Sequence, residues 1–234
     1  KLEEFVFSNA DNLICITSTL SSEIKKAFPT CANSHHILPV GFNKDFLNIK
    51  HQEHKKYDVI YSGNFSEWKG LDVLVEAISI IKHQYNRDIK AVLIGANDQT
   101  KQQYENQAKE LSVFDNIEIV KRVEHKNIYN YIAQSTVGVL SNRYDADGLL
   151  FTSPLKLYEY LGSGLKVVVS RLPSIESNIN ESLVYYATPE KPESFAKEII
   201  RALDDDDFDI NKIKDFSKNY TWESRSKKFM EFIS

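Results

Sequence analysis

Short apolar segments alternate with amphipathic helical patterns through almost the whole chain. Their spacing predicts strands at 13–17, 36–39, 59–62, 91–94, 117–120, 137–140, 167–170 and 183–186. Between these strands, apolar residues recur at helical intervals in the segments 71–81, 128–132 and 195–203. The alternation indicates an α/β fold, a Rossmann-like doubly wound parallel sheet with helices on both faces.

A polar stretch interrupts this alternation and suggests a domain boundary. Residues 50–56 contain no apolar side chain, and we expect a linker over 42–56. Residues 1–41 hold too few elements for a sheet of their own, so we interpret them as a short remnant of a preceding domain. The six later strands and their helices form the predicted main domain, 57–219, and a closing C-terminal helix is expected at 220–234.

The composition is that of a globular protein, and it argues against a nucleic-acid-binding, a disulfide-rich or a membrane-spanning protein. Hydrophobic residues make up 42% and charged residues 26% of the chain. The formal net charge of -4 argues against a general grip on nucleic acid, which needs a basic face. Two cysteines, Cys15 and Cys31, are too few for a disulfide framework, and Cys15 is expected in the core. No apolar run approaches the ~20 residues of a membrane span.

The strongest local pattern covers residues 152–170. Ser153 is expected to cap a helix whose first residue is Pro154. Gly162 and Gly164 are expected to close this helix before a buried strand begins. The pattern therefore predicts a helix whose start lies exposed at the edge of the sheet.

A helix start of this kind suits a phosphate. The first backbone N–H groups have no acceptor within the helix, and the positive end of the helix dipole lies at the same place. Glu159 follows about one and a half turns further along. A phosphate at the helix start and a carboxylate one turn deeper would together hold a nucleotide by its phosphates and its ribose hydroxyls.

The loop after the first main-domain strand, residues 61–70, offers a second candidate. Gly63 allows a tight turn at the strand end. Lys69 lies at the start of the next helix, where a positive charge is unfavourable against the helix dipole. Its side chain therefore either binds an anionic ligand or faces solvent. The loop fits neither G-x-G-x-x-G nor the P-loop, so neither dinucleotide nor P-loop chemistry follows.

Two further strand-end loops carry weaker signals. Gly95 either turns the chain or makes room for a ligand, and the turn is the preferred interpretation. Arg122 and Glu124 either border a pocket for a base or belong to a charged surface loop. These alternatives stay open at this point.

Acidic residues give no convincing metal site. Asp145 and Asp147 lack a third ligand, so a flexible loop near Gly148 is preferred. The four acids of 204–207 are interpreted as a solvated helix end. The chain also lacks a G-x-S-x-G motif, and its histidines lack the spacing of a metal site or a catalytic triad.

Taken together, these motifs resemble glycosyltransferase family 4. The segment from Ser153 to Glu159 and the strand after it are similar to the family's donor-site segment, and Gly63–Gly70 resembles its phosphate loop. Residues 38–41 resemble the crossing between its domains, and 220–222 the start of its closing helix. The resemblance covers nearly the whole chain in order. It implies the C-terminal half of a GT-B glycosyltransferase, an architecture of two Rossmann-like domains that face each other across a cleft.

The resemblance implies a role for each matching residue. Glu159 matches the carboxylate that binds the ribose hydroxyls, and Lys69 matches the lysine that holds the donor diphosphate. The amides of Leu155 and Lys156 match those that approach the distal phosphate. The expected donor phosphate site is therefore Gly63, Asn64, Lys69, Leu155 and Lys156, and base or sugar contacts are expected at Arg122, Val123, Thr152 and Ser153.

Two positions depart from the family pattern. The first glutamate of the family's E-x7-E motif falls at Phe151, so Thr152 or Asp147 would have to take over its contact with the transferred sugar. The basic residue that usually follows the loop glycine is Asn64 here. Phosphate binding would then be weaker or depend on other cations, for which Arg143 and Lys156 are candidates.

By resemblance, the chain is expected to be the donor-binding half of a retaining, metal-independent hexosyltransferase without a cofactor. Its substrates would be a UDP- or GDP-linked sugar and a glycan or lipid-linked acceptor in surface polysaccharide synthesis. We expect it on the cytoplasmic side, peripheral at the inner face of the membrane. The catalytic residues would lie in the N-terminal domain of the same enzyme, so the chain alone should be inactive. Two alternatives stay open: another GT-B enzyme such as a nucleotide-sugar epimerase, and a non-catalytic nucleotide-binding Rossmann-like module.

Overall fold

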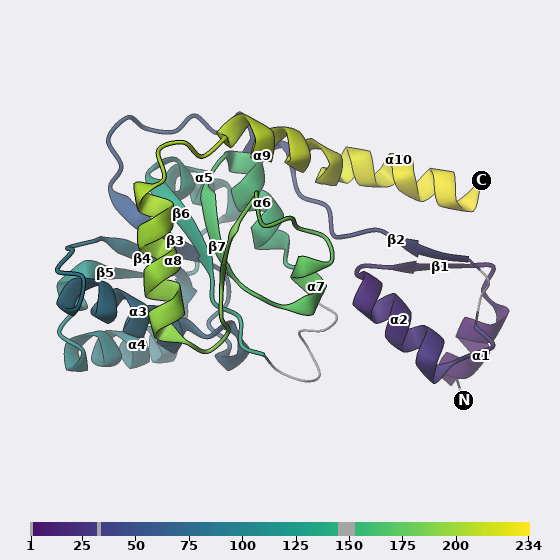
Figure 1. Ribbon diagram of the computed structural model, residues 1–234, viewed down its shortest axis with the longest axis horizontal. Helices are drawn as coiled ribbons and strands as arrows, with labels where there is room; N and C mark the ends of the chain where they lie inside the picture. Colours follow the sequence, from purple (N-terminus) through teal and green to yellow (C-terminus); the bar gives the residue numbers. More distant parts are fainter. Residues whose placement is uncertain (1, 32–33, 145–152) are drawn as a thin grey trace.

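A six-stranded parallel sheet forms the centre of the computed structural model, which describes residues 2–31, 34–144 and 153–234. Its strands are β3 (Tyr57–Ser62), β4 (Ala91–Ala96), β5 (Ile117–Lys121), β6 (Ser135–Leu140), β7 (Lys166–Ser170) and β8 (Tyr185–Ala187). Every neighbouring pair in the sheet is parallel. The predicted Rossmann-like α/β fold is thereby confirmed (Figure 1).

The strand order reverses at β3. The order across the sheet is β5-β4-β3-β6-β7-β8, so the chain builds β4 and β5 on one side of β3 and then β6, β7 and β8 on the other. The carboxyl ends of β3, β4 and β6 therefore meet at a topological switch point. Open α/β sheets bind their ligands at such points.

Helices cover both faces of the sheet. One face carries α3 (Leu71–His83), α4 (Asp98–Glu110) and α8 (Pro192–Asp204). The other carries α5 (His125–Ala133), α6 (Leu155–Ser163) and α9 (Ile210–Ser217). The predicted apolar stripe of α3 is fully buried, and it consists of Leu71, Leu74, Val75, Ile78 and Ile81. Burial of each such side chain contributes about 1.5–3 kcal/mol relative to exposure.

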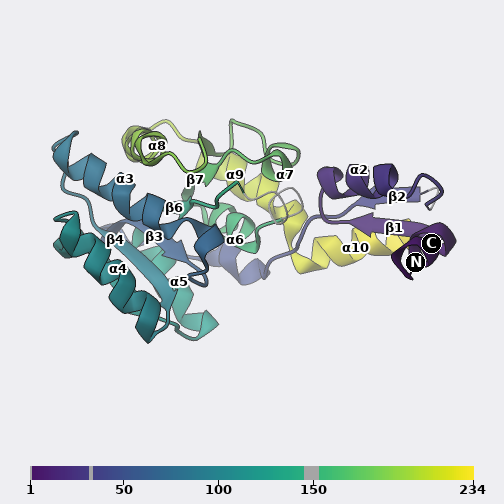
Figure 2. The ribbon, with the colours of Figure 1, turned by 90° about the horizontal axis from the view of Figure 1, so that it is seen from below.

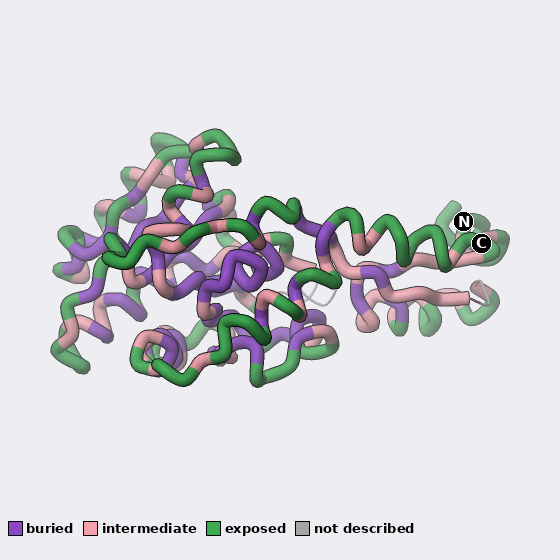
Figure 3. Tube along the Cα trace, turned by 90° about the horizontal axis from the view of Figure 1, so that it is seen from above, coloured by how far each residue is buried: buried purple, intermediate pink, exposed green. Residues whose placement is uncertain are grey.

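Residues 2–37 form a small lobe beside the sheet domain. Its elements are α1 (Leu2–Asn9), β1 (Asn12–Cys15), α2 (Ser18–Ala27) and β2 (Ser34–Ile37). The two strands pair in parallel as a separate sheet, so the expectation that residues 1–41 hold too few elements for a sheet of their own is wrong. Leu2, Phe5 and Val6 on α1 are largely exposed. Figure 3 shows that the buried segments lie mainly in the six-stranded part, whereas the lobe is mostly intermediate or exposed.

The last helix returns from the sheet domain to the lobe. α10 (Trp222–Ile233) runs alongside β1 and β2 (Figure 2). The ring of Phe232 stacks on His36 with 4.2 Å between ring centres, and Arg225 Nε donates to the carbonyl of Pro39 at 3.0 Å. Trp222 and Ile233 remain about half exposed.

The crossing between the lobe and the sheet domain is held by a parallel bridge between Phe42 and Thr221. The Phe42 amide donates to the carbonyl of Tyr220, and the Trp222 amide donates to the carbonyl of Phe42, each at 3.0 Å. The buried ring of Phe42 lies against Gly162, where an added Cβ would be 2.5 Å from the ring. Only glycine therefore fits at position 162.

The predicted linker, residues 42–56, is packed against the sheet domain. It begins with the 3-10 helix η1 (Lys44–Asn48), in which Phe46 is fully buried. His51 Nε2 donates to the carbonyl of Ser163 at 2.7 Å, and burial lowers the pKa of His51. The connection is thus fixed at two points.

The expected start of α6 is wrong by one residue. Pro154 occupies the N-cap position and Leu155 is the first helical residue, whereas Ser153 was expected to cap the helix. The Ser153 hydroxyl instead accepts a hydrogen bond from the Val40 amide at 3.2 Å. It therefore ties the crossing segment to the helix start rather than capping the helix.

Other predicted boundaries also differ. The strands expected at 36–39 and 183–186 are Ser34–Ile37 and Tyr185–Ala187. Gly162 lies inside α6 because its missing side chain admits the ring of Phe42, and Gly164, at φ +88°, forms the C-cap. The first predicted strand, 13–17, ends at Cys15 because the Thr17 hydroxyl caps α2 by accepting from the Leu20 amide at 3.1 Å.

Short elements complete the fold. They are the helix α7 (Pro173–Glu176) and the 3-10 helices η2 (Glu67–Lys69), η3 (Phe114–Asn116) and η4 (Lys218–Tyr220). No helix in the described ranges has the length and apolar character that crossing a membrane requires.

Candidate functional site

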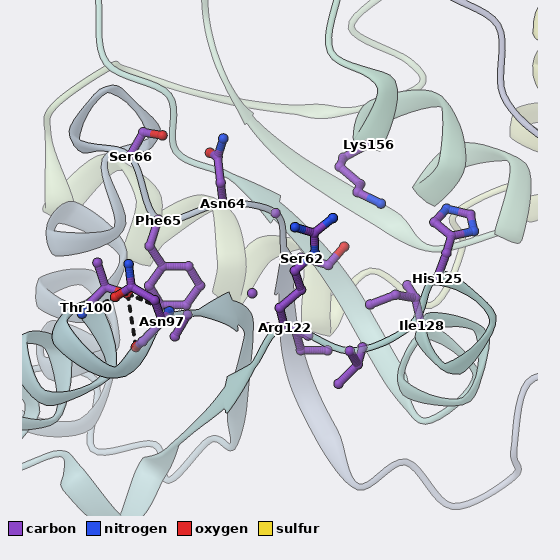
Figure 4. Close-up of a pocket in the computed structure, with 15 residues that line it drawn as sticks. Ser62, Asn64, Phe65, Ser66, Asn97, Thr100, Arg122, His125, Ile128 and Lys156 are labelled. Atoms are coloured by element: carbon purple, nitrogen blue, oxygen red, sulfur yellow. Dashed lines mark hydrogen bonds between the residues drawn. The ribbon is translucent and has the colours of Figure 1, made fainter.

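A cavity of about 740 Å³ opens at the carboxyl ends of β3, β4 and β5. The loops after these strands and the first turn of α6 form its walls (Figure 4). The lining includes the predicted site residues Gly63, Asn64, Arg122, Val123 and Lys156. Residues from three loops and from the helices α4, α5 and α6 thus meet at the carboxyl edge of the sheet.

Two cations line the cavity. Arg122 and Lys156 are among its described lining residues, together with the imidazole of His125, and neither aspartate nor glutamate is. Polar groups such as Ser62 and Asn97 and apolar ones such as Ile128 make up the rest. A site of this chemistry suits an anionic ligand that also carries a flat or apolar part.

Backbone contact between the first two loops shapes one wall of the cavity. Gly95 has a φ of +121°, and a Cβ at this position would lie 1.9 Å from the carbonyl oxygen of Gly63. The Gly63 amide donates to the carbonyl of Ile94 at 3.0 Å. Gly95 is therefore required for the close approach of two backbone segments. It lies inside β4, at an irregularity in the pairing with β5, rather than in a turn after the strand, and it also lines the cavity.

Lys69 lies beside the loop but is not among the cavity's lining residues. It ends η2, two residues before α3, and its ammonium lies 3.6 Å from the centre of the Trp68 ring. Burial lowers the pKa of Lys69 to about 8. Gly70, at φ +62°, would place a Cβ 2.2 Å from the carbonyl of Ser141, so the loop is pressed against the end of β6. The assignment of Lys69 to the diphosphate stays a prediction.

Glu159 lies deep in α6 and is not exposed to the cavity. Its side chain is 2% exposed and carries an ion pair with Lys156, whose Nζ lies 2.5 Å from one carboxylate oxygen. The other oxygen lies 3.4 Å from His125 Nε2. A buried carboxylate needs such partners because an unpaired charge is costly away from water. Lys156 and His125 therefore separate Glu159 from the cavity.

The start of α6 faces the cavity through Lys156. Leu155 and Lys156 form the first turn, where amide groups lack acceptors within the helix. Proline at the N-cap has no polar side chain that could cover these amides. The predicted contact of both amides with a phosphate is compatible with this geometry and stays a prediction.

Several predicted residues have other surroundings. Ser153 bonds to Val40, as described above, and is absent from the cavity's lining. Thr152, Phe151 and Asp147 lie outside the described residues. Glu124, one possible border of a base pocket, forms an ion pair with Lys126 at 2.7 Å instead.

Arg143 is engaged away from the cavity through its two terminal guanidinium nitrogens, whereas its buried Nε has no hydrogen-bond partner among the described residues. Its guanidinium forms ion pairs with Asp72 and with Glu190, the latter at 3.1 Å. The Arg143 amide donates to the carbonyl of Trp68 at 2.9 Å. Arg143 thus links the first loop to the end of β6. Its positive charge is already paired with two carboxylates and is not available to a ligand.

Two residues near the site were not singled out from the sequence. His125 contacts Glu159 across 34 positions of sequence, a distance that no local pattern reveals. The buried hydroxyl of Tyr160 bonds to Ser62 at both the amide, 2.7 Å, and the hydroxyl, 3.0 Å. Burial raises the pKa of this hydroxyl, so Tyr160 is a neutral support for the end of β3.

Solved structures share this fold at low sequence identity. A glycosyltransferase from Rickettsia africae ESF-5 has a TM-score of 0.79 and 16% identity over 98% of this chain and 65% of that chain. Anabaena Alr3699/HepE in complex with UDP and glucose has a TM-score of 0.78 and 14% identity over 99% and 65%. WaaG, a glycosyltransferase involved in lipopolysaccharide biosynthesis, has a TM-score of 0.70 and 15% identity over 94% and 62%. The fold is therefore the Rossmann-like half of a GT-B glycosyltransferase.

The family follows from the sequence itself. Residues 43–221 match the model of the family described as glycosyl transferases group 1, so the chain belongs to that family. Among curated proteins, no sequence matches the chain. The chain spans 65% of the Rickettsia africae protein and a similar share of the other two.

Proposed function

We propose that the cavity binds the nucleotide diphosphate of a UDP- or GDP-linked sugar. The observation that carries this proposal is a cavity whose described lining residues include two cations and no carboxylate, at the carboxyl edge of the sheet and the start of α6. The structure of Anabaena Alr3699/HepE with UDP and glucose supports it by analogy of fold. The chain would then be the donor-binding part of a glycosyltransferase.

In this proposal, different site residues contact different parts of the donor. Gly63, Asn64, Lys69 and the amides of Leu155 and Lys156 bind the phosphates, and Glu159 binds the ribose hydroxyls. Base or sugar contacts come from Arg122, Val123, Thr152 and Ser153. For Glu159 to reach the ribose, Lys156 has to leave the carboxylate and turn to the phosphates. The donor hydroxyls then replace the lysine as hydrogen-bond partners of the buried carboxylate.

The chemistry is a retaining, metal-independent transfer of a hexosyl group in glycosyltransferase family 4. The bond between the sugar and the distal phosphate breaks, and the nucleoside diphosphate leaves with growing negative charge. In this proposal, Lys69, Lys156 and the first amides of α6 stabilise that charge with little rearrangement of solvent. This stabilisation is the contribution of these residues to the reaction.

The acceptor side completes the proposal. Residues 1–41 belong to the acceptor-side domain, which carries the catalytic residues, and residues 42–56 link it to the donor domain. The acceptor is a glycan or a lipid-linked sugar in surface polysaccharide synthesis, at the cytoplasmic face of the membrane. The involvement of WaaG in lipopolysaccharide biosynthesis supports this assignment by analogy. The chain alone should bind nucleotide and transfer little sugar.

Calorimetric titration with UDP, GDP, ADP and CMP tests the donor site. We expect one nucleoside diphosphate to bind best. Glu159→Gln and Lys69→Ala should each weaken its binding by about 10-fold or more. Lys126→Ala is a matched control because this exposed lysine lies outside the cavity. Circular dichroism checks that each variant is folded. Nucleotide binding that ignores both Glu159 and Lys69 would indicate a different site, and no binding by the folded chain would overturn the proposal.

A further inference from the structure

The proposed donor site has few cations for the charge of the ligand that it would bind. A nucleoside diphosphate carries several negative charges over two phosphates, and Lys156 is the one lysine among the described lining residues of the cavity. Position 64, directly after the loop glycine, is asparagine. The Asn64 carbonyl is already fixed because the Tyr61 hydroxyl donates to it at 2.6 Å. The phosphate loop itself therefore brings no positive charge into the cavity.

The other candidate cations are poorly placed to fill this gap. Arg143 forms ion pairs with Asp72 and Glu190, and turning it toward a ligand would leave two carboxylates unpaired. Lys69 lies on the Trp68 ring rather than in the cavity's lining. Neither residue replaces a cation at position 64.

Arg122 has the placement that both lack. Its amide donates to the carbonyl of Ala96 at 3.1 Å, which fixes the start of the β5–α5 loop against the end of β4. The residue is exposed and lines the cavity, and no described residue forms an ion pair with it. Figure 4 shows its guanidinium directed into the cavity, toward the space between Ser62 and Lys156. This space lies at the end of β3, where the phosphate loop begins.

We propose that the guanidinium of Arg122 binds the donor phosphates and supplies, from the β5–α5 loop, the positive charge that is missing at Asn64. The inference rests on the proposed nucleotide-sugar function and assigns the Arg122 side chain to phosphate rather than to the base. A guanidinium offers parallel N–H donors that match two oxygens of a phosphate. Arg122, from the β5–α5 loop, and Lys156, from α6, then both bind the diphosphate.

Ligands trimmed at the phosphate test this assignment. The dissociation constants of UDP, UMP and uridine, and of GDP, GMP and guanosine, are measured for the wild type and for Arg122→Gln, with nucleosides followed by NMR. We expect Arg122→Gln to weaken the diphosphate by about 10- to 100-fold and to leave the nucleoside unchanged. Arg122→Lys should retain part of the affinity, and Lys126→Gln, near the same loop but outside the cavity, should retain all of it.

Relocating the charge gives a second measurement. Asn64→Arg combined with Arg122→Gln should recover most of the lost diphosphate affinity because the cation returns to the loop. An equal loss for diphosphate and nucleoside in Arg122→Gln would assign Arg122 to the base and overturn the inference, as would no loss at all. If Glu159→Gln weakens UDP or GDP while Arg122→Gln does not, the donor site stands and this inference falls. If the folded wild type binds no nucleoside diphosphate, both fall together.

Discussion

The ammonium of Lys156 lies 2.5 Å from a carboxylate oxygen of Glu159, three residues further along α6. The lysine is 24% exposed and the carboxylate 2%, so a cation at the cavity wall neutralises an acid inside the helix layer. Such a pair is a structural support in the free protein. A ligand that draws Lys156 away from Glu159 must also offset the free energy of leaving this carboxylate without its cation.

Lys156→Met should destabilise the fold because, among the described residues, it leaves His125 as the one polar partner of a buried carboxylate. Allowing for the partial exposure of Lys156, we expect the free energy of unfolding to fall by about 1–3 kcal/mol. Urea denaturation measures this change. Lys156→Met with Glu159→Gln should recover most of the stability but not nucleotide binding. A loss no larger than that of Lys126→Met, from the exposed pair with Glu124, would contradict this account.

Nucleotide binding should weaken at alkaline pH because of Lys69, whose pKa is lowered to about 8 in the free protein. A bound diphosphate stabilises the charged lysine and raises this pKa. Below pH 8 the lysine is charged before and after binding, so affinity is highest there. Above pH 8 binding must take up a proton, and affinity should fall by up to about tenfold per pH unit.

Titrations between pH 7 and pH 10 check this dependence in two buffers of different ionisation enthalpy. Lys69→Arg should flatten the profile because a guanidinium stays charged throughout this range. A wild-type affinity that does not change with pH would remove Lys69 from the site.

Gly95→Ala should be among the most damaging single substitutions. The residue has a φ of +121°, and its Cβ would meet the backbone oxygen of Gly63. Because backbone has little freedom to move, we expect a loss of about 2–3 kcal/mol and weaker nucleotide binding. Gly164→Ala is a comparison at φ +88°, where the Cβ meets the flexible side chain of Lys214. Its expected loss is about 1 kcal/mol. Denaturation that ranks the two variants in the reverse order would contradict the argument.

Tyr160→Phe should loosen the end of β3. The substitution removes the hydroxyl that bonds to both polar groups of Ser62 and leaves a buried amide without its acceptor. The expected loss is about 1–3 kcal/mol. Hydrogen exchange of the Ser62 amide should become faster than in the wild type. Tyr85→Phe, at an exposed tyrosine, should change neither quantity. Unchanged protection of Ser62 would mean that Tyr160 does not support this loop.

The sequence predicted the sheet but not its order or every helix. Alternation of apolar segments is local information, whereas the order of strands depends on how crossing helices pack. α4 shows a further limit, because only Tyr104 and Ala108 of its residues are buried and its apolar pattern is weak. Its reliable signal is the capping box, in which Asn97 and Thr100 bond to each other's backbone amides. Capping residues therefore indicate this helix better than apolar periodicity does.

The part of the site that is formed by loops at strand ends was predictable from the sequence. Gly63, Asn64, Arg122 and Val123 follow strands, and parallel strands bring their carboxyl ends to one edge, so these residues share the cavity. Side-chain partners were beyond reach, because the place of Lys69 on Trp68 and the contact of His125 with Glu159 depend on packing.

The bridge between Phe42 and Thr221 has a mechanical consequence. Two backbone hydrogen bonds hold the chain where it leaves the lobe and where it returns in α10, so a rotation of the lobe must turn about this pair. Two residues earlier, the Val40 amide is tied to Ser153 at the start of α6. A displacement of the lobe would therefore reach the start of the helix whose Lys156 lines the cavity. The site proposed for the donor would thus be coupled to the position of the lobe through hydrogen bonds.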